Sequence, residues 1–339
     1  LTTGTDIICD PFCGSGTFAY AALDFNRIVK INEWEPYAFR MMTAPFRGVP
    51  QQGKFEQAYE KFCAIVQPQI KKIYKTQCPE CGAELIYDAI FFDREPEEYF
   101  HPTRHERMGD NGENVIFRGK NHQCMCGCKE KIYDDFDEVV RKNVEEMEVD
   151  FPDATMLENS RLNFTAPQFT VYSNMFSHRQ QVALMAIFHA IEQLDPETKP
   201  FFEETFFSII HLGKYTDYRS KSQDNHCPEN RLKETNLYNR FIEKLFLRKK
   251  YIEEQQFDIS RVSTSNKDYR EFLDSIEAGS VKLVLTDPPY GDNAQYFEHA
   301  QRVHPFMGYN LSTDTERLKK EVVISNARIR IDKHDKEQF

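Results

Sequence analysis

The sequence predicts an α/β protein with a mainly parallel sheet, which a long insertion of different character interrupts. Two strand–helix units open the chain within residues 6–46, and two more close it from residue 257 onward. Strands that alternate with helices are typical of parallel sheets, because each helix carries the chain back across the sheet. The 339 residues, 40 % of them hydrophobic, suffice for one large or two ordinary domains.

The opening units are a strand at residues 6–9, a glycine-rich turn and a helix that should begin near Ser15. A second short apolar strand, residues 28–32, leads into a helical segment at residues 37–46. Both strands are bounded by turn residues, as expected of parallel strands in a βαβ arrangement.

The closing units place a helix at residues 269–276 and then the run GSVKLVLT at residues 279–286. This run is almost continuously apolar, which fits a central strand covered on both faces. We therefore expect it to lie inside the sheet.

The insertion contains four segments with helical patterns, at residues 55–74, 134–148, 177–194 and 237–255. Ser177 and Gln180 fit a capping box at the start of the third segment. We divide the chain into four parts. The α/β core comprises a first part, residues 1–50, and a second part, residues 257–339. Between them lie an insertion with the cysteine clusters, residues 51–150, and a helical insertion, residues 151–256.

The formal net charge of −11 argues against a generic nucleic-acid binder, which is usually basic. Residues 214–250, however, hold ten Lys or Arg against five Asp or Glu, a local excess of five positive charges. These residues also interleave aromatic and amide side chains, which suits contacts with phosphates and base edges. An ordinary solvated polar region is the alternative interpretation.

The apolar runs are too short to cross a bilayer, and no secretory signal precedes the first strand. We therefore expect a cytoplasmic protein with no membrane partner. Because the chain starts at Leu1, almost on a strand, we expect a piece of a longer polypeptide.

The glycine-rich turn DPFCGSG, residues 10–16, is the first candidate ligand site. Gly14 and Gly16 allow positive φ and close approach of the backbone to a ligand. No Lys-Ser or Lys-Thr pair follows, so this is not a phosphate loop, and the dinucleotide fingerprint is incomplete.

Two acidic residues follow the next strands. Glu33 ends the second strand, about twenty residues after the glycine-rich turn. A carboxylate at this position can accept hydrogen bonds from ribose hydroxyls. Asp268 ends the third strand just before a helix, where it could cap that helix and also reach a ligand.

The stretch DPPY, residues 287–290, ends the last strand. Pro288 and Pro289 fix φ and remove two backbone donors, which leaves a stiff segment rich in acceptors. Asp287 adds a carboxylate, and Tyr290 can stack on a flat ring. This combination suits an amino group whose hydrogens must be held, and a simple turn does not require it.

The cysteines fall into two clusters, CPECG at residues 78–82 and CMCGC at residues 124–128. In a chain without a secretory signal, paired cysteines indicate a metal site more often than disulfide bonds. Zinc takes four ligands, so Cys78, Cys81 and Cys124 would be joined by Cys126 or Cys128. We expect a structural zinc that ties down the insertion.

Together DPFCGSG, Glu33, Asp268 and DPPY resemble the DNA amino-methyltransferases that use S-adenosylmethionine. The DPPY form resembles the adenine-specific branch, and the cysteine clusters resemble its members that carry a zinc ribbon. The resemblance covers residues 1–46 and 257–300, and less specifically residues 172–191.

The resemblance implies a Rossmann-like methyltransferase core and a role for each matching residue. Asp10, Pro11, Phe12, Gly14 and Gly16 would line the methionine side of S-adenosylmethionine. Glu33 would hold the ribose with Trp34 against the adenine ring, and Asp268 with Tyr269 would meet the adenine edge. Asp287 and the Pro288 carbonyl, held by Pro289, would accept hydrogen bonds from the target amino group, and Tyr290 would stack on the flipped target base.

The resemblance also implies DNA as partner, and it leaves open whether restriction or other defence-system subunits join it. Alternatives stay open: a methyltransferase for the cytosine amino group, for RNA or for protein glutamine, or a non-catalytic nucleic-acid-binding fragment. A methyltransferase sheet normally has about seven strands and we count four, so we expect the core to be incomplete at its C-terminal end.

Overall fold

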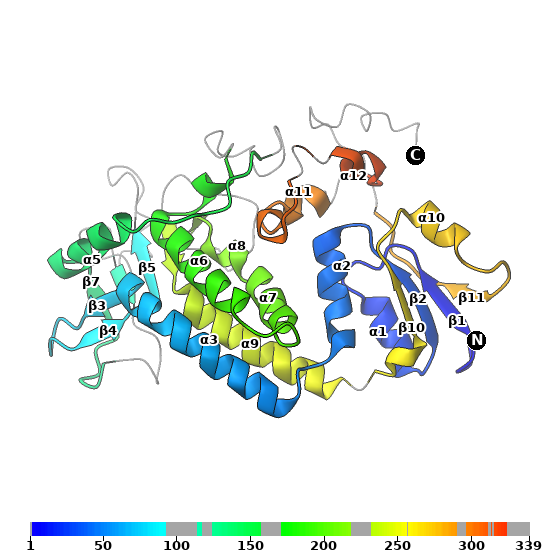
Figure 1. Ribbon diagram of the computed structural model, residues 1–339, viewed down its shortest axis with the longest axis horizontal. Helices are drawn as coiled ribbons and strands as arrows, with labels where there is room; N and C mark the ends of the chain where they lie inside the picture. The colour runs from blue at the N-terminus through cyan, green and yellow to red at the C-terminus, as the bar shows by residue number, and fades with distance from the viewer. Residues whose placement is uncertain are drawn as a thin grey trace, which may run out of the picture. The chain divides into compact units, whose positions relative to one another are not determined.

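The computed structural model describes residues 2–92, 114–116, 124–156, 171–217, 232–255, 257–289, 296–310, 313 and 315–323. The chain forms two compact units (Figure 1). The first unit comprises Leu1–Val49, Leu157–Ser160 and Arg248–Phe339, and the second comprises Pro50–Met156 and Arg161–Leu247. Within the described residues, every helix is too short or too polar to span a bilayer.

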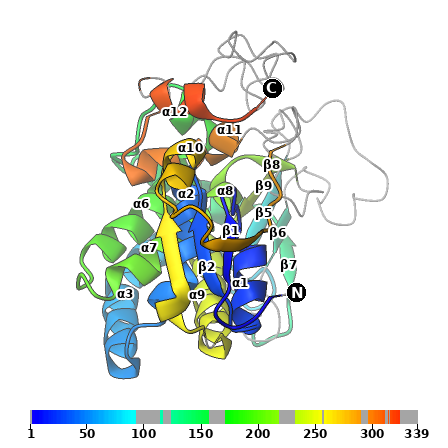
Figure 2. The ribbon, with the colours of Figure 1, turned by 90° about the vertical axis from the view of Figure 1, so that its right-hand side faces the viewer.

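A parallel sheet of four strands organises the first unit, in the order β10-β2-β1-β11 (Figure 2). The strands are β1 (Ile7–Asp10), β2 (Ile28–Asn32), β10 (Val262–Ser265) and β11 (Val281–Val284). Because the strands are parallel, all four carboxyl ends meet at one edge of the sheet. The expected α/β class with a mainly parallel sheet is confirmed.

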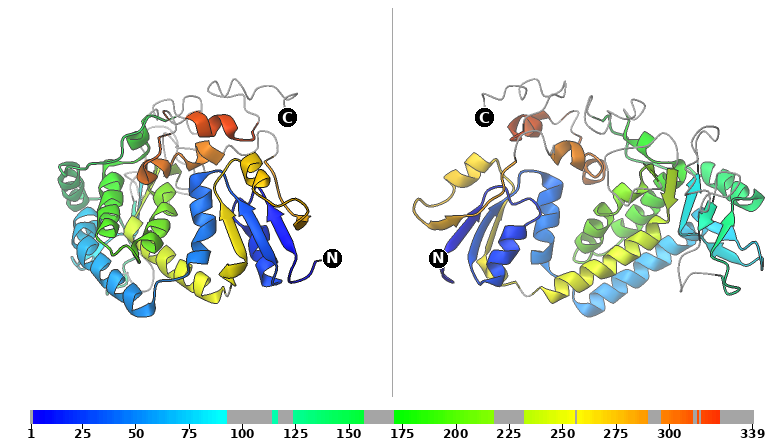
Figure 3. Two further views of the ribbon diagram at one scale, coloured as in Figure 1. Left: turned by 45° about the vertical axis from the view of Figure 1, so that its right-hand side comes forward. Right: turned by 180° about the vertical axis from the view of Figure 1, so that it is seen from behind.

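The helices of the first unit follow the strands in a βα pattern (Figure 3). Their bounds are α1 (Thr17–Asp24), α2 (Pro36–Thr43), η1 (Ala44–Arg47), η4 (Ile259–Arg261), α10 (Tyr269–Asp274), α11 (Tyr296–Ala300), η5 (His304–Met307) and α12 (Thr315–Lys320). Leu23 of α1 and Met42 of α2 pack with Ile8, Val29 and Ile31 of the strands to form the core.

The prediction that the last apolar run is covered on both faces is wrong for the described residues. β11 lies at the edge of the sheet and pairs with β1 alone among the described strands. Leu283, Val284 and Leu285 are 39 %, 56 % and 39 % exposed. An apolar run indicates burial, but it does not specify which element provides the cover.

The second unit combines helices with two small antiparallel sheets. Its helices are α3 (Gln52–Ile73), α5 (Asp135–Glu145), η3 (Tyr172–Met175), α6 (His178–Glu192), α7 (Lys199–Phe207), α8 (Ile210–Gly213) and α9 (Leu237–Glu254), of which the residues from Arg248 onward belong to the first unit. Phe62 of α3 is fully buried against the rings of Phe202 and Phe241, from α7 and α9. This aromatic contact holds the three helices together.

A five-stranded antiparallel sheet in this unit was not predicted. Its order is β7-β6-β5-β9-β8, and a separate hairpin pairs β3 with β4. The strands are β3 (Lys75–Gln77), β4 (Glu84–Ile86), β5 (Ala89–Phe92), β6 (Asn114–Ile116), β7 (Glu130–Ile132), β8 (Thr216–Asp217) and β9 (Leu232–Thr235). Strands this short carry little periodicity in the sequence.

Candidate functional site

A cavity opens at the carboxyl edge of the parallel sheet, where the loops after all four strands converge. Open α/β sheets bind ligands at this edge. The described residues that line the cavity are Pro11, Phe12, Gly14, Asn32, Glu33, Trp34, Glu35, Asp268, Tyr269, Asp287, Pro289, Tyr296, Phe297, Lys320, Glu321 and Val322. Nine of the residues that the sequence analysis selected are therefore brought to one place.

Three other selected residues lie next to this cavity without lining it: Asp10, Gly16 and Pro288. Asp10 is 3 % exposed and accepts hydrogen bonds from Thr286 Oγ1 at 2.6 Å and from the Phe12 N–H at 3.1 Å. Burial raises the pKa of Asp10, and the neighbouring Asp287 carboxylate raises it further. Asp10 thus fixes the loop after β1 to the end of β11.

The glycine-rich turn adopts the backbone that glycine favours. Gly14 has φ +54 and Gly16 has φ +86, and Gly16 is the N-cap of α1. A Cβ on Gly16 would lie 2.9 Å from the ring of Tyr20, so only glycine fits there without a shift.

Glu33 connects the turn to the end of β2. Its carboxylate accepts the N–H of Gly14 at 2.9 Å and the N–H of Glu35 at 2.8 Å. Burial raises the pKa of Glu33 to about 7, although these backbone hydrogen bonds oppose the shift. A carboxylate has about four lone-pair sites, so acceptor capacity remains for a ligand.

Two asparagines that the sequence analysis did not select hold the loops in register. Asn32 Nδ2 donates to the carbonyls of Pro11 at 3.2 Å and Lys267 at 2.9 Å, and its Oδ1 accepts the Lys267 N–H at 3.0 Å. Asn266 Nδ2 donates to the carbonyls of Glu33 at 2.5 Å and Trp34 at 3.1 Å. The loops after β1, β2 and β10 are therefore bonded to one another through side-chain amides.

Trp34 forms one wall with the C-terminal segment of the described chain. Its Nε1 donates to the Arg317 carbonyl at 3.1 Å, and the Arg317 guanidinium lies 4.7 Å from the ring centroid. Lys320 Nζ lies 5.6 Å from the same ring. Cation–π contacts of this kind hold the indole in a fixed orientation.

Asp268 acts as the expected N-cap of α10 and also faces the cavity. Its carboxylate accepts the Arg270 N–H at 2.9 Å and two side-chain N–H groups of Arg270 at 2.9 and 2.8 Å. The Arg270 guanidinium lowers the pKa of Asp268, so this carboxyl stays ionised. The next residue, Tyr269, packs its ring 5.1 Å from that of Phe12.

Asp287 and Pro289 line the cavity at the end of β11, whereas Tyr290 lies outside the described residues. Gly14 and Asp287, which belong to different loops, thus share one cavity. The cavity is narrow, about 60 Å³, against roughly 300–1,000 Å³ for typical small-molecule sites. A nucleoside-sized ligand would therefore need side chains of the wall to move.

Below this wall, Glu35 caps α2 and binds a buried histidine. Its carboxylate accepts the N–H groups of Tyr37 at 3.0 Å and Ala38 at 2.6 Å. His304 Nε2 lies 2.6 Å from Glu35 Oε1, and the two side chains are 2 % and 3 % exposed. This pair could not be predicted from local sequence patterns, since its members are 269 residues apart.

The second unit holds a four-cysteine cluster that could bind a metal such as zinc. One sulfur from each of Cys78, Cys81, Cys124 and Cys126 lies within 4.8 Å of the others. The sulfurs of Cys78 and Cys126 are 3.5 Å apart and those of Cys81 and Cys124 are 3.0 Å apart, against about 3.8 Å expected around tetrahedral zinc. Cys128 is not in this group, and its sulfur donates to the Glu130 carbonyl at 3.3 Å.

The pKa of the Cys78 thiol is lower than that of a free cysteine. Desolvation raises its pKa, but hydrogen bonds from the backbone of Cys81 and Glu80 outweigh this and lower the pKa to about 6. A thiolate is the form that binds zinc.

The basic segment expected to contact DNA is described only in part, because residues 218–231 lie outside the described residues. Lys214 is 1 % exposed and so contributes nothing to a basic surface. Arg240 pairs with Asp88 and Glu243, and further along α9 the pairs are Lys249–Glu253 and Lys250–Glu254. Much of the described positive charge is therefore neutralised locally.

Comparison of the chain with protein-family models, with curated proteins and with solved structures found no match.

Proposed function

We propose that this chain transfers a methyl group from S-adenosylmethionine to the exocyclic amino group of adenine in DNA. The observation that carries the proposal is the single cavity that Gly14, Glu33, Asp268 and Asp287 share at the carboxyl edge of the parallel sheet. In this proposal the first unit is a Rossmann-like methyltransferase core.

The chemistry of the cavity fits S-adenosylmethionine. Phe12 and Gly14, with Asp10 and Gly16 behind them, would hold its methionine side. Glu33 would accept hydrogen bonds from the ribose hydroxyls, and Trp34, Asp268 and Tyr269 would surround the adenine. When bound, this cofactor supplies a methyl group that its sulfonium has already activated.

The chain's own part in the reaction is to prepare and position the nucleophile. An exocyclic amino group is a poor nucleophile because its lone pair is delocalised into the ring. Asp287 and the Pro288 carbonyl would accept hydrogen bonds from its two N–H groups and so favour a tetrahedral nitrogen with a free lone pair. This nitrogen would take the methyl group as the methyl–sulfur bond breaks, and one amino proton would then be released to solvent. Most of the catalysis is then positioning, and no covalent enzyme intermediate is needed.

A base inside a duplex cannot reach this cavity, so the target adenine would be flipped out. Tyr290 follows the two prolines and would stack on the extruded base in place of its lost neighbours. The four-cysteine cluster would hold a structural zinc, which supports the second unit and takes no part in methyl transfer.

The proposal is tested by incubating the purified chain with labelled S-adenosylmethionine and, in parallel, with DNA, RNA and protein substrates. Label in DNA that hydrolyses to methylated adenine supports it. Label that enters only cytosine, RNA or protein glutamine contradicts the substrate assignment, and calorimetry without cofactor binding contradicts the assignment of the cavity.

A further inference from the structure

A second cavity lies wholly inside the second unit, between the antiparallel sheet, α5 and the amino end of α6. Its volume is about 410 Å³, within the range of about 300–1,000 Å³ of small-molecule sites. Side chains that define its walls are Phe92, Tyr133, Val144, His178, Arg179 and Glu234. None of these residues has a role in the proposed methyl transfer.

The charges of the cavity wall are balanced. Arg179 Nη1 lies 2.8 Å from Glu234 Oε2, and these side chains are 8 % and 7 % exposed. Arg141, also in the wall, pairs with Glu145 and with Glu138 at 2.6 Å. Two carboxylates of the wall therefore offset its two guanidinium groups, so the cavity favours a neutral polar ligand over a phosphate.

Hydrogen-bonding groups remain in the wall after these pairs have formed. His178 Nε2 lies 2.9 Å from the Met147 carbonyl, to which it can only donate, so Nδ1 of the neutral ring is an acceptor. The wall thus presents the His178 acceptor and the Arg179–Glu234 pair beside the flat rings of Phe92 and Tyr133.

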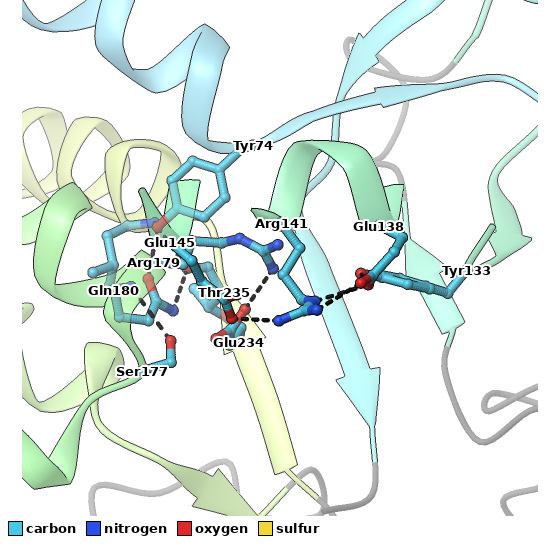
Figure 4. A network of polar contacts seen from close by, with 11 residues as sticks. Tyr74, Tyr133, Glu138, Arg141, Glu145, Ser177, Arg179, Gln180, Glu234 and Thr235 are labelled. Carbon is cyan, nitrogen blue, oxygen red and sulfur yellow. Dashed lines mark hydrogen bonds and ion pairs between the residues drawn. The ribbon is translucent and has the colours of Figure 1, made fainter. Parts of the chain in front are cut away.

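The amino end of α6 is hydrogen-bonded to Tyr74 and to β9, as Figure 4 shows. Gln180 accepts a hydrogen bond from the Tyr74 hydroxyl at 2.6 Å and donates to the Thr235 carbonyl at 2.9 Å. Arg179 is the preceding residue on the helix, and Glu234 precedes Thr235 on β9. The Arg179–Glu234 pair is therefore preorganised, which lowers the entropy cost of binding a ligand.

We propose that this cavity binds one unstacked nucleobase of a DNA strand. The edge of a base presents acceptors next to donors, which matches the Arg179–Glu234 pair, and its ring is flat, uncharged and sized for the cavity. Phe92 and Tyr133 would pack against the ring. This inference rests on the proposed function in one respect, which is that the nucleobase comes from DNA.

The test uses the full chain and a short single-stranded DNA oligonucleotide that carries one fluorophore and one photoreactive halogenated uracil. Val144→Phe fills the cavity from α5, and Glu234→Gln removes the carboxylate charge. Val139→Phe is the matched control, because Val139 is 57 % exposed on the same helix and does not line the cavity. Melting curves verify that each variant is folded.

We expect Val144→Phe to weaken oligonucleotide binding about tenfold, since stacking of one base contributes roughly 1–3 kcal/mol. Glu234→Gln should weaken it severalfold, and Val139→Phe should bind as the wild type does. Cross-links should map to the peptides of Phe92 or Tyr133. Unchanged binding by folded Val144→Phe, cross-links confined to other peptides, or no binding by the wild type would overturn the inference.

The same experiments distinguish failure of the proposed function from failure of the nucleobase site. A wild-type chain that binds the oligonucleotide in this cavity but neither binds S-adenosylmethionine nor transfers methyl groups would overturn the methyltransferase assignment alone. A chain that methylates adenine with unchanged DNA affinity in Val144→Phe would overturn the second site alone.

Discussion

The backbone N–H of Gly14 donates to Oε2 of Glu33 over 2.9 Å, so the turn after β1 is bonded to the residue that follows β2. The bond places an acidic side chain against the loop of glycines within the cavity. Since burial raises the pKa of Glu33 to about 7, the charge of this carboxylate changes near neutral pH.

The first prediction concerns the pH dependence of cofactor binding. Ribose hydroxyls donate best to the ionised carboxylate, so protonation of Glu33 should oppose binding. Below the pKa, binding requires loss of a proton, and the affinity for S-adenosylmethionine should fall by up to about tenfold per pH unit. From about pH 8 upward it should be constant. Trp34, the single tryptophan of the chain, lines the cavity and reports binding through its fluorescence.

Glu33→Gln is the control for this assignment. The amide does not titrate, so the variant should bind more weakly and with an affinity that is flat from about pH 6 to pH 8. An equally steep pH profile in Glu33→Gln would assign the titration to another group.

The second prediction separates catalysis from cofactor binding at Asp287. In the proposed function, Asp287→Ala would remove an acceptor for the target amino group, and loss of one such preorganised hydrogen bond costs roughly 100- to 1,000-fold in rate. Methyl transfer should fall by about that factor or more, while the dissociation constant for S-adenosylmethionine measured at Trp34 stays within about twofold. The readouts are label incorporation into DNA and fluorescence titration.

Asp274→Ala serves as the matched control, because Asp274 is an exposed carboxylate at the end of α10. It should transfer methyl groups at the wild-type rate. If Asp287→Ala also did so, the catalytic assignment would be wrong.

Much of the first unit could be predicted from local sequence. The strand expected at residues 28–32 coincides with β2 (Ile28–Asn32), because its apolar residues and flanking turns are contiguous. Glycine turns and acidic residues at strand ends also predicted which side chains meet in the cavity, since parallel strands bring their carboxyl ends together.

What could not be predicted depends on pairing between distant segments. Asn32 donates to the Lys267 carbonyl 235 residues away, and in the sequence it is indistinguishable from any polar residue after a strand. Likewise β5 pairs with β9, Ala89 opposite Thr235, and each strand has four residues. Segments this short provide neither a helical nor a strand period.

The choice between Cys126 and Cys128 shows the same limit. CMCGC offers three thiols at nearly equal spacing, so the sequence leaves two ligand sets open. The structure groups Cys126 with Cys78, Cys81 and Cys124 and turns the Cys128 sulfur to a carbonyl. Ligand choice here is set by the path of the loop, which the spacing alone does not determine.

The third prediction follows from this grouping. Cys126→Ser should lose most of the bound zinc and melt at a lower temperature, because one of four thiolates is replaced by a poor ligand. Cys128→Ser is a closely matched control and should retain about one zinc per chain with little change in melting. Metal content by plasma mass spectrometry and melting by circular dichroism are the measurements, and the reverse pattern would place Cys128 in the site.

The fourth prediction concerns stability at the base of the cavity. Glu35→Ala removes the cap from two N–H groups of α2 and leaves buried His304 Nε2 without its partner. Loss of a cap costs about 1 kcal/mol and a broken buried pair about 3 kcal/mol or more, so the unfolding free energy should fall by roughly 3–4 kcal/mol. Urea denaturation measures this, with Glu277→Ala, an exposed site in the same unit, as control. Because Glu35 also lines the cavity, the folded Glu35→Ala variant should bind S-adenosylmethionine more weakly. Equal stability of Glu35→Ala and Glu277→Ala would show that the Glu35–His304 contact does not stabilise this part of the fold.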